Sequence, residues 1–161
     1  MPLAQYLIAY GDYLTSLGRG QDAARQYALV RAEQRLLAAN GARDDLTVAQ
    51  LGADHGDPVG ALRAARAEWT RRHSVLVAGA LGWALHVNGR HAEALHYARV
   101  ATRLGWRNTN LYYHLGMIEA ANHRNADARE HLTLALRINP HLSPVDAPRA
   151  RRQLTRLGRE P

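Results

Sequence analysis

The 161-residue sequence contains no cysteine, no lysine and no phenylalanine, and it has only six prolines. The absence of cysteine excludes disulfide bonds and thiol catalysis, and it removes the commonest ligand of structural zinc sites. Alanine and leucine are abundant, whereas valine, isoleucine and phenylalanine rarely cluster. This composition favours helices over strands.

Long apolar stretches are also missing. The longest, Val75 to Leu85, is too short to cross a bilayer and contains glycines. The start, Met1-Pro2-Leu3, lacks the basic region and apolar core of a signal peptide. We therefore expect a soluble, cytoplasmic protein without a membrane partner.

The net charge is +7, and arginine supplies all of the basic residues other than histidine. Arginine, alanine and glycine together are typical of a GC-rich genome, so part of the charge reflects coding bias. Arg99, Arg103 and Arg107 would share one helix face, which suggests binding of nucleic acid or another anion. Because they fall on an expected outer helix that also carries Glu93, a solvated face is the favoured interpretation.

The main feature of the sequence is an internal repeat. Four segments share a small residue in a first helix, a residue at a turn and an alanine early in a second helix. These triplets are Gly11, Gly18 and Ala23; Ala49, Gly56 and Ala61; Gly82, Gly89 and Ala94; and Gly116, His123 and Ala128. The step from Ala49 to Gly82 is 33 residues and the step to Gly116 is 34. The first step is longer, so we expect the second helix of the first pair to extend through residues 34–37.

A helix-turn-helix unit of this period resembles the tetratricopeptide repeat (TPR) family. In the fourth copy, the residues at the family's pattern positions are Tyr112, Leu115, Gly116, Ala128, Ala135 and Pro140. The resemblance covers residues 4–141 and implies an all-α fold, an α-α superhelix of about four helix pairs. Asp45, Glu68 and His123 depart from the pattern, since the family prefers a bulky apolar residue, a small residue and a glycine there.

We expect one domain, residues 1–161, with repeats at about 4–41, 42–74, 75–108 and 109–142. A capping helix over 144–158 should follow, with Ser143 or Asp146 as its N-cap and arginines on its wet face. The first helix, in contrast, is apolar on most sides, where a terminal helix should be polar on its outer face. Its apolar residues are Leu3, Tyr6, Leu7, Ile8, Tyr10, Leu14 and Leu17. We therefore keep open that the chain self-associates or ends a longer array.

In this family the first helices line a concave groove, and the resemblance implies which residues face it. In the first two copies they include Gln5, Ile8, Asp12, Arg43, Leu46 and Gln50. In the last two copies they give the predicted partner-binding set of Leu76, Trp83, His86, Asn110, Tyr113, His114 and Met117. Helix 74–87 is apolar nearly all round, which favours contact with more than its neighbours. For Trp83, simple packing remains an equal alternative.

These residues predict a scaffold that binds a protein, as a peptide or a helix, in an apolar and aromatic groove. A clamp for C-terminal carboxylates is disfavoured, because lysine is absent and Arg43 is the one inward arginine. A homo-oligomer remains possible as the second interpretation.

The sequence offers little support for a metal, a cofactor or catalysis. His86, His91 and His96 are spaced by five residues, which turns them away from a common face, and the chain has no His-Glu-x-x-His motif. His86 and His114 could meet across neighbouring helices, but two imidazoles alone are weak evidence of a site. Glu119 lies five residues from His114, a poor spacing for a proton relay. We therefore expect a protein that is not an enzyme.

Overall fold

The computed structural model describes residues 4–158, which form nine α-helices and no strand. The helices are α1 (Ala4–Ser16), α2 (Gly20–Ala39), α3 (Asp45–Asp54), α4 (Pro58–Arg71), α5 (Val75–Val87), α6 (His91–Thr102), α7 (Thr109–Ala121), α8 (Asn125–Ile138) and α9 (Asp146–Leu157). The all-α prediction is confirmed. The predicted domain ends and the apolar residue Leu3 lie outside the described residues.

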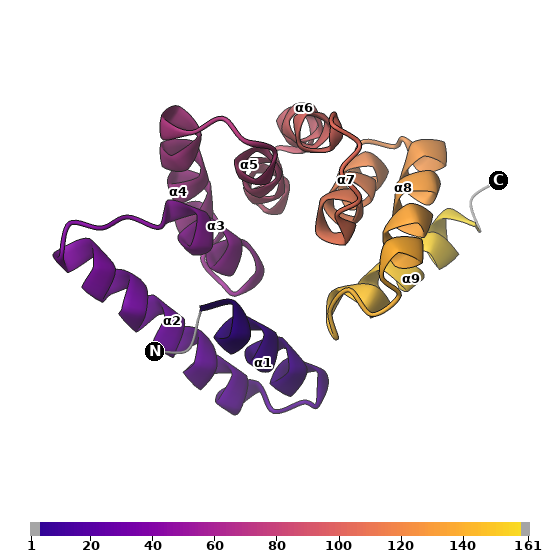
Figure 1. The fold of residues 1–161 in the computed structure, drawn as a ribbon. Helices are drawn as coiled ribbons and strands as arrows, with labels where there is room; N and C mark the ends of the chain where they lie inside the picture. The colour runs from indigo at the N-terminus through magenta and orange to yellow at the C-terminus, as the bar shows by residue number, and fades with distance from the viewer. Residues whose placement is uncertain (1–3, 159–161) are drawn as a thin grey trace.

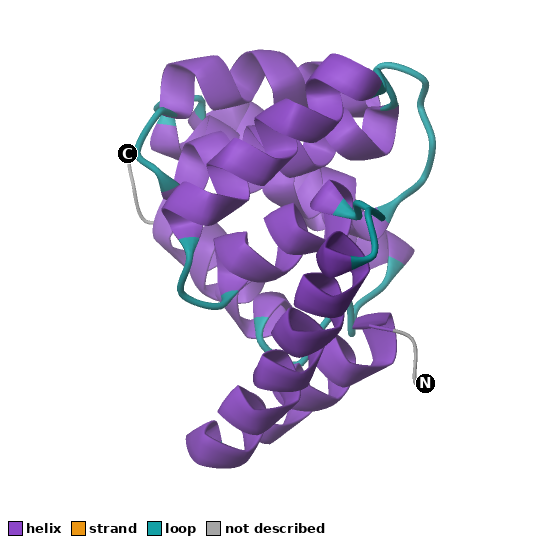
Figure 2. Ribbon diagram, turned by 90° about the vertical axis from the view of Figure 1, so that its left-hand side faces the viewer, coloured by secondary structure: helices purple, strands orange, loops and turns teal. Residues whose placement is uncertain are grey.

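The helices form antiparallel pairs that stack into an arc, with α1, α3, α5 and α7 on its inner side (Figure 1). The second helices, α2, α4, α6 and α8, lie on the outer side, and α9 packs against α7 and α8. Seen from the side, the described chain consists only of helices joined by loops (Figure 2). The predicted α-α superhelix is confirmed, and α2 does extend to Ala39. No described helix has the length and apolar character needed to cross a bilayer.

The four aligned turn positions share a left-handed backbone. Gly18, Gly56 and Gly89 have φ values of 74°, 92° and 75°, and His123 has 58°. Glycine adopts this conformation without steric cost, and histidine tolerates it better than a β-branched residue does. The departure at His123 therefore leaves the turn intact.

The aligned small residues are the places where paired helices come close together. Ala61, Ala94 and Ala128 are completely buried, and Ala23 is almost so. A Cβ atom added to Gly82 would lie 3.1 Å from the backbone nitrogen of Ala98. The repeat found in the sequence is therefore a repeat of helix-helix contacts.

The stack is also held by a pair of asparagines that the sequence pattern did not reveal. Asn88, after α5, donates from Nδ2 to the carbonyl of Pro58, 2.7 Å away at the start of α4. Asn122, after α7, makes the same bond to the carbonyl of His91 at 2.9 Å. Each side chain thus joins a first helix to the second helix of the preceding pair.

Asp45 and Glu68, the two residues of the second repeat that depart from the TPR pattern, share an ion-pair partner, Arg71. Arg71 lies 2.5 Å from Oδ2 of Asp45 and 2.5 Å from Oε2 of Glu68. Arg72 pairs with the other Glu68 oxygen at 2.7 Å. Glu68 is buried, so these bonds offset the cost of a carboxylate at a position that usually holds a small residue.

Replacing Gly116 with alanine should destabilise the stack. The new Cβ would lie 2.7 Å from Cγ and 3.0 Å from the backbone nitrogen of Leu132, which is fully buried. We expect a loss of about 1–3 kcal/mol in the free energy of unfolding, measured by urea denaturation. Gly20→Ala is the matched control, since the space around Gly20 is open. Equal stability of the two variants would contradict the close helix contact.

Candidate functional site in the concave groove

The inner side of the arc holds a cavity of about 390 Å³. Residues from α1, α3, α5 and α7 line it, together with the segment that leads into α9. The lining includes Gln5, Ile8, Asp12, Gln50, Asp54, Leu76, Trp83, Asn110, His114, Ser143 and Asp146. First helices from all four pairs therefore contribute to one site.

The predicted partner-binding residues fall into two groups. Leu76, Trp83, Asn110 and His114 line the cavity, and Leu76 is 40% exposed. His86, Tyr113 and Met117 are not part of the lining.

The residues of the second group differ in exposure: Tyr113 is buried, whereas His86 and Met117 are partly exposed. Tyr113 is 1% exposed, so a partner would not reach its ring, and Met117 packs against the core. Of the groove residues expected in the first two copies, Arg43 and Leu46 are likewise outside the lining. The sequence pattern predicted which side chains face the groove, but it did not reveal how exposed each of them is.

Trp83 is a packing residue whose edge reaches the cavity. It is 6% exposed, and its indole stacks on the rings of His114 and His86 at centroid distances of 4.1 Å and 4.9 Å. Its Nε1 donates a hydrogen bond of 2.8 Å to Oδ1 of Asp54. These contacts fix the indole in one orientation.

Three carboxylates from distant parts of the chain line the cavity: Asp12 in α1, Asp54 at the end of α3 and Asp146 at the start of α9. Asp12 accepts a hydrogen bond of 2.9 Å from the Tyr27 hydroxyl, and its Oδ1 lies 3.3 Å from Nε2 of His55. Asp12 was predicted to face the groove, whereas Asp54 was missed. Nothing in the local sequence separates Asp54 from an ordinary helix end.

Asp146 has several partners at the mouth of the cavity. It accepts hydrogen bonds from the Tyr113 hydroxyl at 3.2 Å and from Ser143 Oγ at 2.9 Å, and it pairs with Arg149 at 3.2 Å. Ser143 Oγ also accepts from the backbone nitrogen of Asp146. The N-cap of α9 is Val145, however, so neither Ser143 nor Asp146 holds the predicted N-cap position. Only a capping role was predicted for Asp146, because its place in the groove depends on how the stack curves.

The surroundings of Asp12 and Asp54 disfavour the charged forms of these two carboxylates. Desolvation raises the pKa of Asp54 to about 6, against the lowering effect of the Trp83 hydrogen bond. Desolvation also raises the pKa of Asp12. The negative charge of Asp146 adds to both shifts. Three carboxylates therefore share one cavity in a protein whose net charge is +7.

Three histidines near the groove, His55, His86 and His114, are neutral at pH 7. Desolvation lowers the pKa of His55, His86 and His114 to about 4 in each case. His86 Nδ1 lies 3.1 Å from Nδ1 of His91, and His86 and His114 each stack on the Trp83 indole. Within residues 4–158, no three histidine or carboxylate side chains are arranged to hold a metal ion.

Glu119 contacts His131, and not His114 as a proton relay would require. It is 2% exposed and its Oε2 lies 2.7 Å from Nδ1 of His131 on α8. This hydrogen bond raises the pKa of His131. Glu119 therefore links α7 to α8 and does not act on His114.

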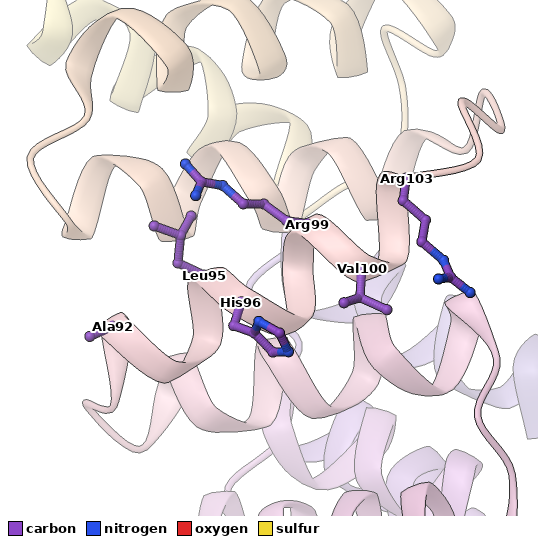
Figure 3. Close-up of a pocket in the computed structure, with 6 residues that line it drawn as sticks. All are labelled: Ala92, Leu95, His96, Arg99, Val100 and Arg103. Carbon is purple, nitrogen blue, oxygen red and sulfur yellow. The ribbon is translucent and has the colours of Figure 1, made fainter.

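Arg99 and Arg103 line a second hollow of about 400 Å³ on α6 (Figure 3). Its lining is Ala92, Leu95, His96, Arg99, Val100 and Arg103, all from one helix and its C-cap. The guanidinium groups of Arg99 and Arg103 point toward opposite ends of the hollow (Figure 3). They do not converge on one position where they could bind a phosphate together. The expectation that Arg107 shares a helix face with Arg99 and Arg103 is wrong, because α6 ends at Thr102 and Arg107 lies in the loop that follows.

Comparisons with known proteins support the fold. No protein-family model and no curated protein matches the chain. Among solved structures, a thermophilic TPR protein of Thermus thermophilus has a TM-score of 0.62 and 21% identity, over 96% of this chain and 80% of that one. A double mutant of MamA from RS-1 has a TM-score of 0.51 and 14% identity, over 99% and 96% of the two chains. The fold is TPR-like.

Replacing His114 with phenylalanine should reduce the loss of stability in acid. The pKa of His114 is about 4 in the folded chain, against 6.5 for the free side chain. The unfolded state therefore binds more protons between these values, and stability falls as the pH drops through this range. Phenylalanine removes this contribution, about 1–2 kcal/mol between pH 7 and pH 5. Urea unfolding at both pH values measures it, and an equal loss in both proteins would contradict the burial of His114.

Proposed function

We propose that the chain is a scaffold that holds a peptide or helix of another protein in its concave groove and catalyses no reaction itself. The observation that carries this proposal is the cavity shared by the first helices of all four pairs. TPR-like stacking supports it, because solenoids of this kind present extended concave surfaces for partners.

The walls of the groove have the mixed character of a peptide site. Leu76 offers an exposed apolar side chain, while Asn110 and Gln50 offer amide groups for hydrogen bonds. The Trp83 indole provides a rigid aromatic edge between them. Anchors for one apolar side chain, together with polar groups around it, suit an extended segment or a helix face.

The hydrogen bonds made by the polar groups of the groove favour a binding role over catalysis. Ser143 donates to Asp146, and Asp54 accepts from an indole. A nucleophilic serine is most often activated by a histidine, and among the described residues Ser143 Oγ contacts Asp146 and no histidine.

Selection from a random peptide display library tests the scaffold function. Peptides selected on the immobilised chain should bind Leu76→Asn at least about tenfold more weakly, because the variant loses an apolar anchor. Leu104→Asn is the matched control, since Leu104 is 70% exposed and lies after α6 on the outer side. Selected peptides that bind both variants equally well, or an absence of selected peptides, would contradict groove binding.

Self-association is a second candidate function. It is favoured by one face of α1, which is exposed although the equivalent faces of α5 and α7 are buried. In α5 and α7 one face is buried in the core, through Val77, Leu81 and Ala84 and through Leu111, Leu115 and Ile118. The residues at the same positions of α1 are Tyr6, Tyr10 and Tyr13, which are 63%, 49% and 51% exposed. We call these three residues the tyrosine stripe.

The tyrosine stripe lies on the face of α1 whose equivalent, in α5 and α7, contacts the preceding helix pair. Asn88 and Asn122 reach across that surface, and the corresponding residue after α1 is Leu17, which is 54% exposed. An uncharged stripe of tyrosines with leucine has the composition of protein interfaces. A second copy of the chain, packed stripe against stripe, would bury it.

Light scattering during size-exclusion chromatography tests this second function. The wild-type chain should form a dimer at high concentration, and the double variant Tyr10→Asp, Tyr13→Asp should be a monomer because paired charges would be buried. Leu104→Asp controls for added charge at an exposed apolar site and should remain a dimer. A wild-type monomer at every concentration would contradict the role of the tyrosine stripe.

A further inference from the structure

We propose that the groove selects a basic partner, whose lysine or arginine side chain enters between Asp12, Asp54 and Asp146. This inference rests on the proposed scaffold function and specifies the chemistry of its partner. The bound segment would place an apolar side chain on Leu76 beside the basic one.

The groove differs in charge from the rest of the protein. Three carboxylates line it, although the whole chain carries a net charge of +7. Arg149 pairs with Asp146 at 3.2 Å and is the cation that most reduces the repulsion among them. The side chain of Arg31 is directed instead to the carbonyl of His55, at 2.5 Å. The groove therefore keeps an excess of negative charge for a ligand to neutralise.

The neighbours of Asp12 and Asp54 are neutral groups. Asp12 contacts the Tyr27 hydroxyl and the His55 ring, which is neutral at pH 7 because burial lowers its pKa to about 4. Asp54 contacts the Trp83 indole N–H. Hydrogen bonds of this kind orient the two carboxylates without cancelling their charge.

The floor of the cavity supplies a further unsatisfied atom. The ring of His114 lines the cavity, and its Nδ1 is buried with no hydrogen-bond partner among the described residues. In a neutral imidazole one ring nitrogen is an acceptor. When the ring proton is on Nε2, Nδ1 is this acceptor, and an N–H donor satisfies it.

The size of the site indicates an organic cation. The three carboxylates belong to α1, α3 and α9, and within residues 4–158 no group of side chains is close enough to hold a metal ion. A cavity of about 390 Å³ has room for a long side chain. The aliphatic stem of lysine or arginine would lie along Leu76 with its charged end among the carboxylates.

The Trp83 indole N–H gives a direct signal from this site, because it is bonded to Asp54. In ¹H–¹⁵N NMR spectra, assigned with Trp83→Phe, titration with acetyl-hexa-arginine amide should shift that signal until it saturates. Asp54→Asn retains an acceptor for the indole and should weaken binding about tenfold or more. Asp127→Asn, which removes the same charge from the outer helix α8, should change it by less than about twofold.

An unmoved Trp83 signal, or equal binding to wild type and Asp54→Asn, would overturn the proposal. If Asp54→Asn fails to fold, Asp12→Asn makes the same test at another carboxylate. The display selection separates this inference from the function on which it rests. Selected peptides that depend on Leu76 but contain no basic residue would overturn the basic partner and leave the scaffold standing.

Discussion

The close contact between the two helices of each pair determines the rest of the structure. At Gly82 and Gly116 the first helix carries no side chain where the second helix passes, and Ala94 and Ala128 meet it there with completely buried side chains. Larger residues at these four places would force the helices apart. The contact recurs at a nearly constant interval over the last three pairs, and these pairs stack closely on one another, whereas the first pair touches the second less closely. The stack bends into an arc (Figure 1).

The bend brings groups together that are far apart in the sequence. Asp12, Asp54 and Asp146 belong to the first helix, the third helix and the last, yet all of them line one cavity. Trp83 stands at the centre of the arc, where it bonds Asp54 and stacks on His114. The acidic character of the groove is therefore a property of the whole stack and of no single repeat.

The sequence predicted those features that depend on local geometry. The left-handed turn at His123 and the buried alanines at Ala61 and Ala94 follow from small-residue spacing alone, since each concerns contacts within one pair. The groove was predicted less well. Tyr113 lies on the expected helix but is buried, and the place of Asp146 in the groove was missed, because both outcomes depend on curvature accumulated over several repeats.

Helix α1 and the segment before α9 line one cavity, so we expect them to keep a fixed separation, and a distance measurement tests this central claim directly. The sequence contains no cysteine, so spin labels can be attached at Gln5→Cys on α1 and His141→Cys before α9 without further substitutions. Both positions are exposed and line the cavity. Pulsed electron spin resonance should give a single narrow distance distribution. A broad distribution would show that the ends move independently, and it would contradict the account.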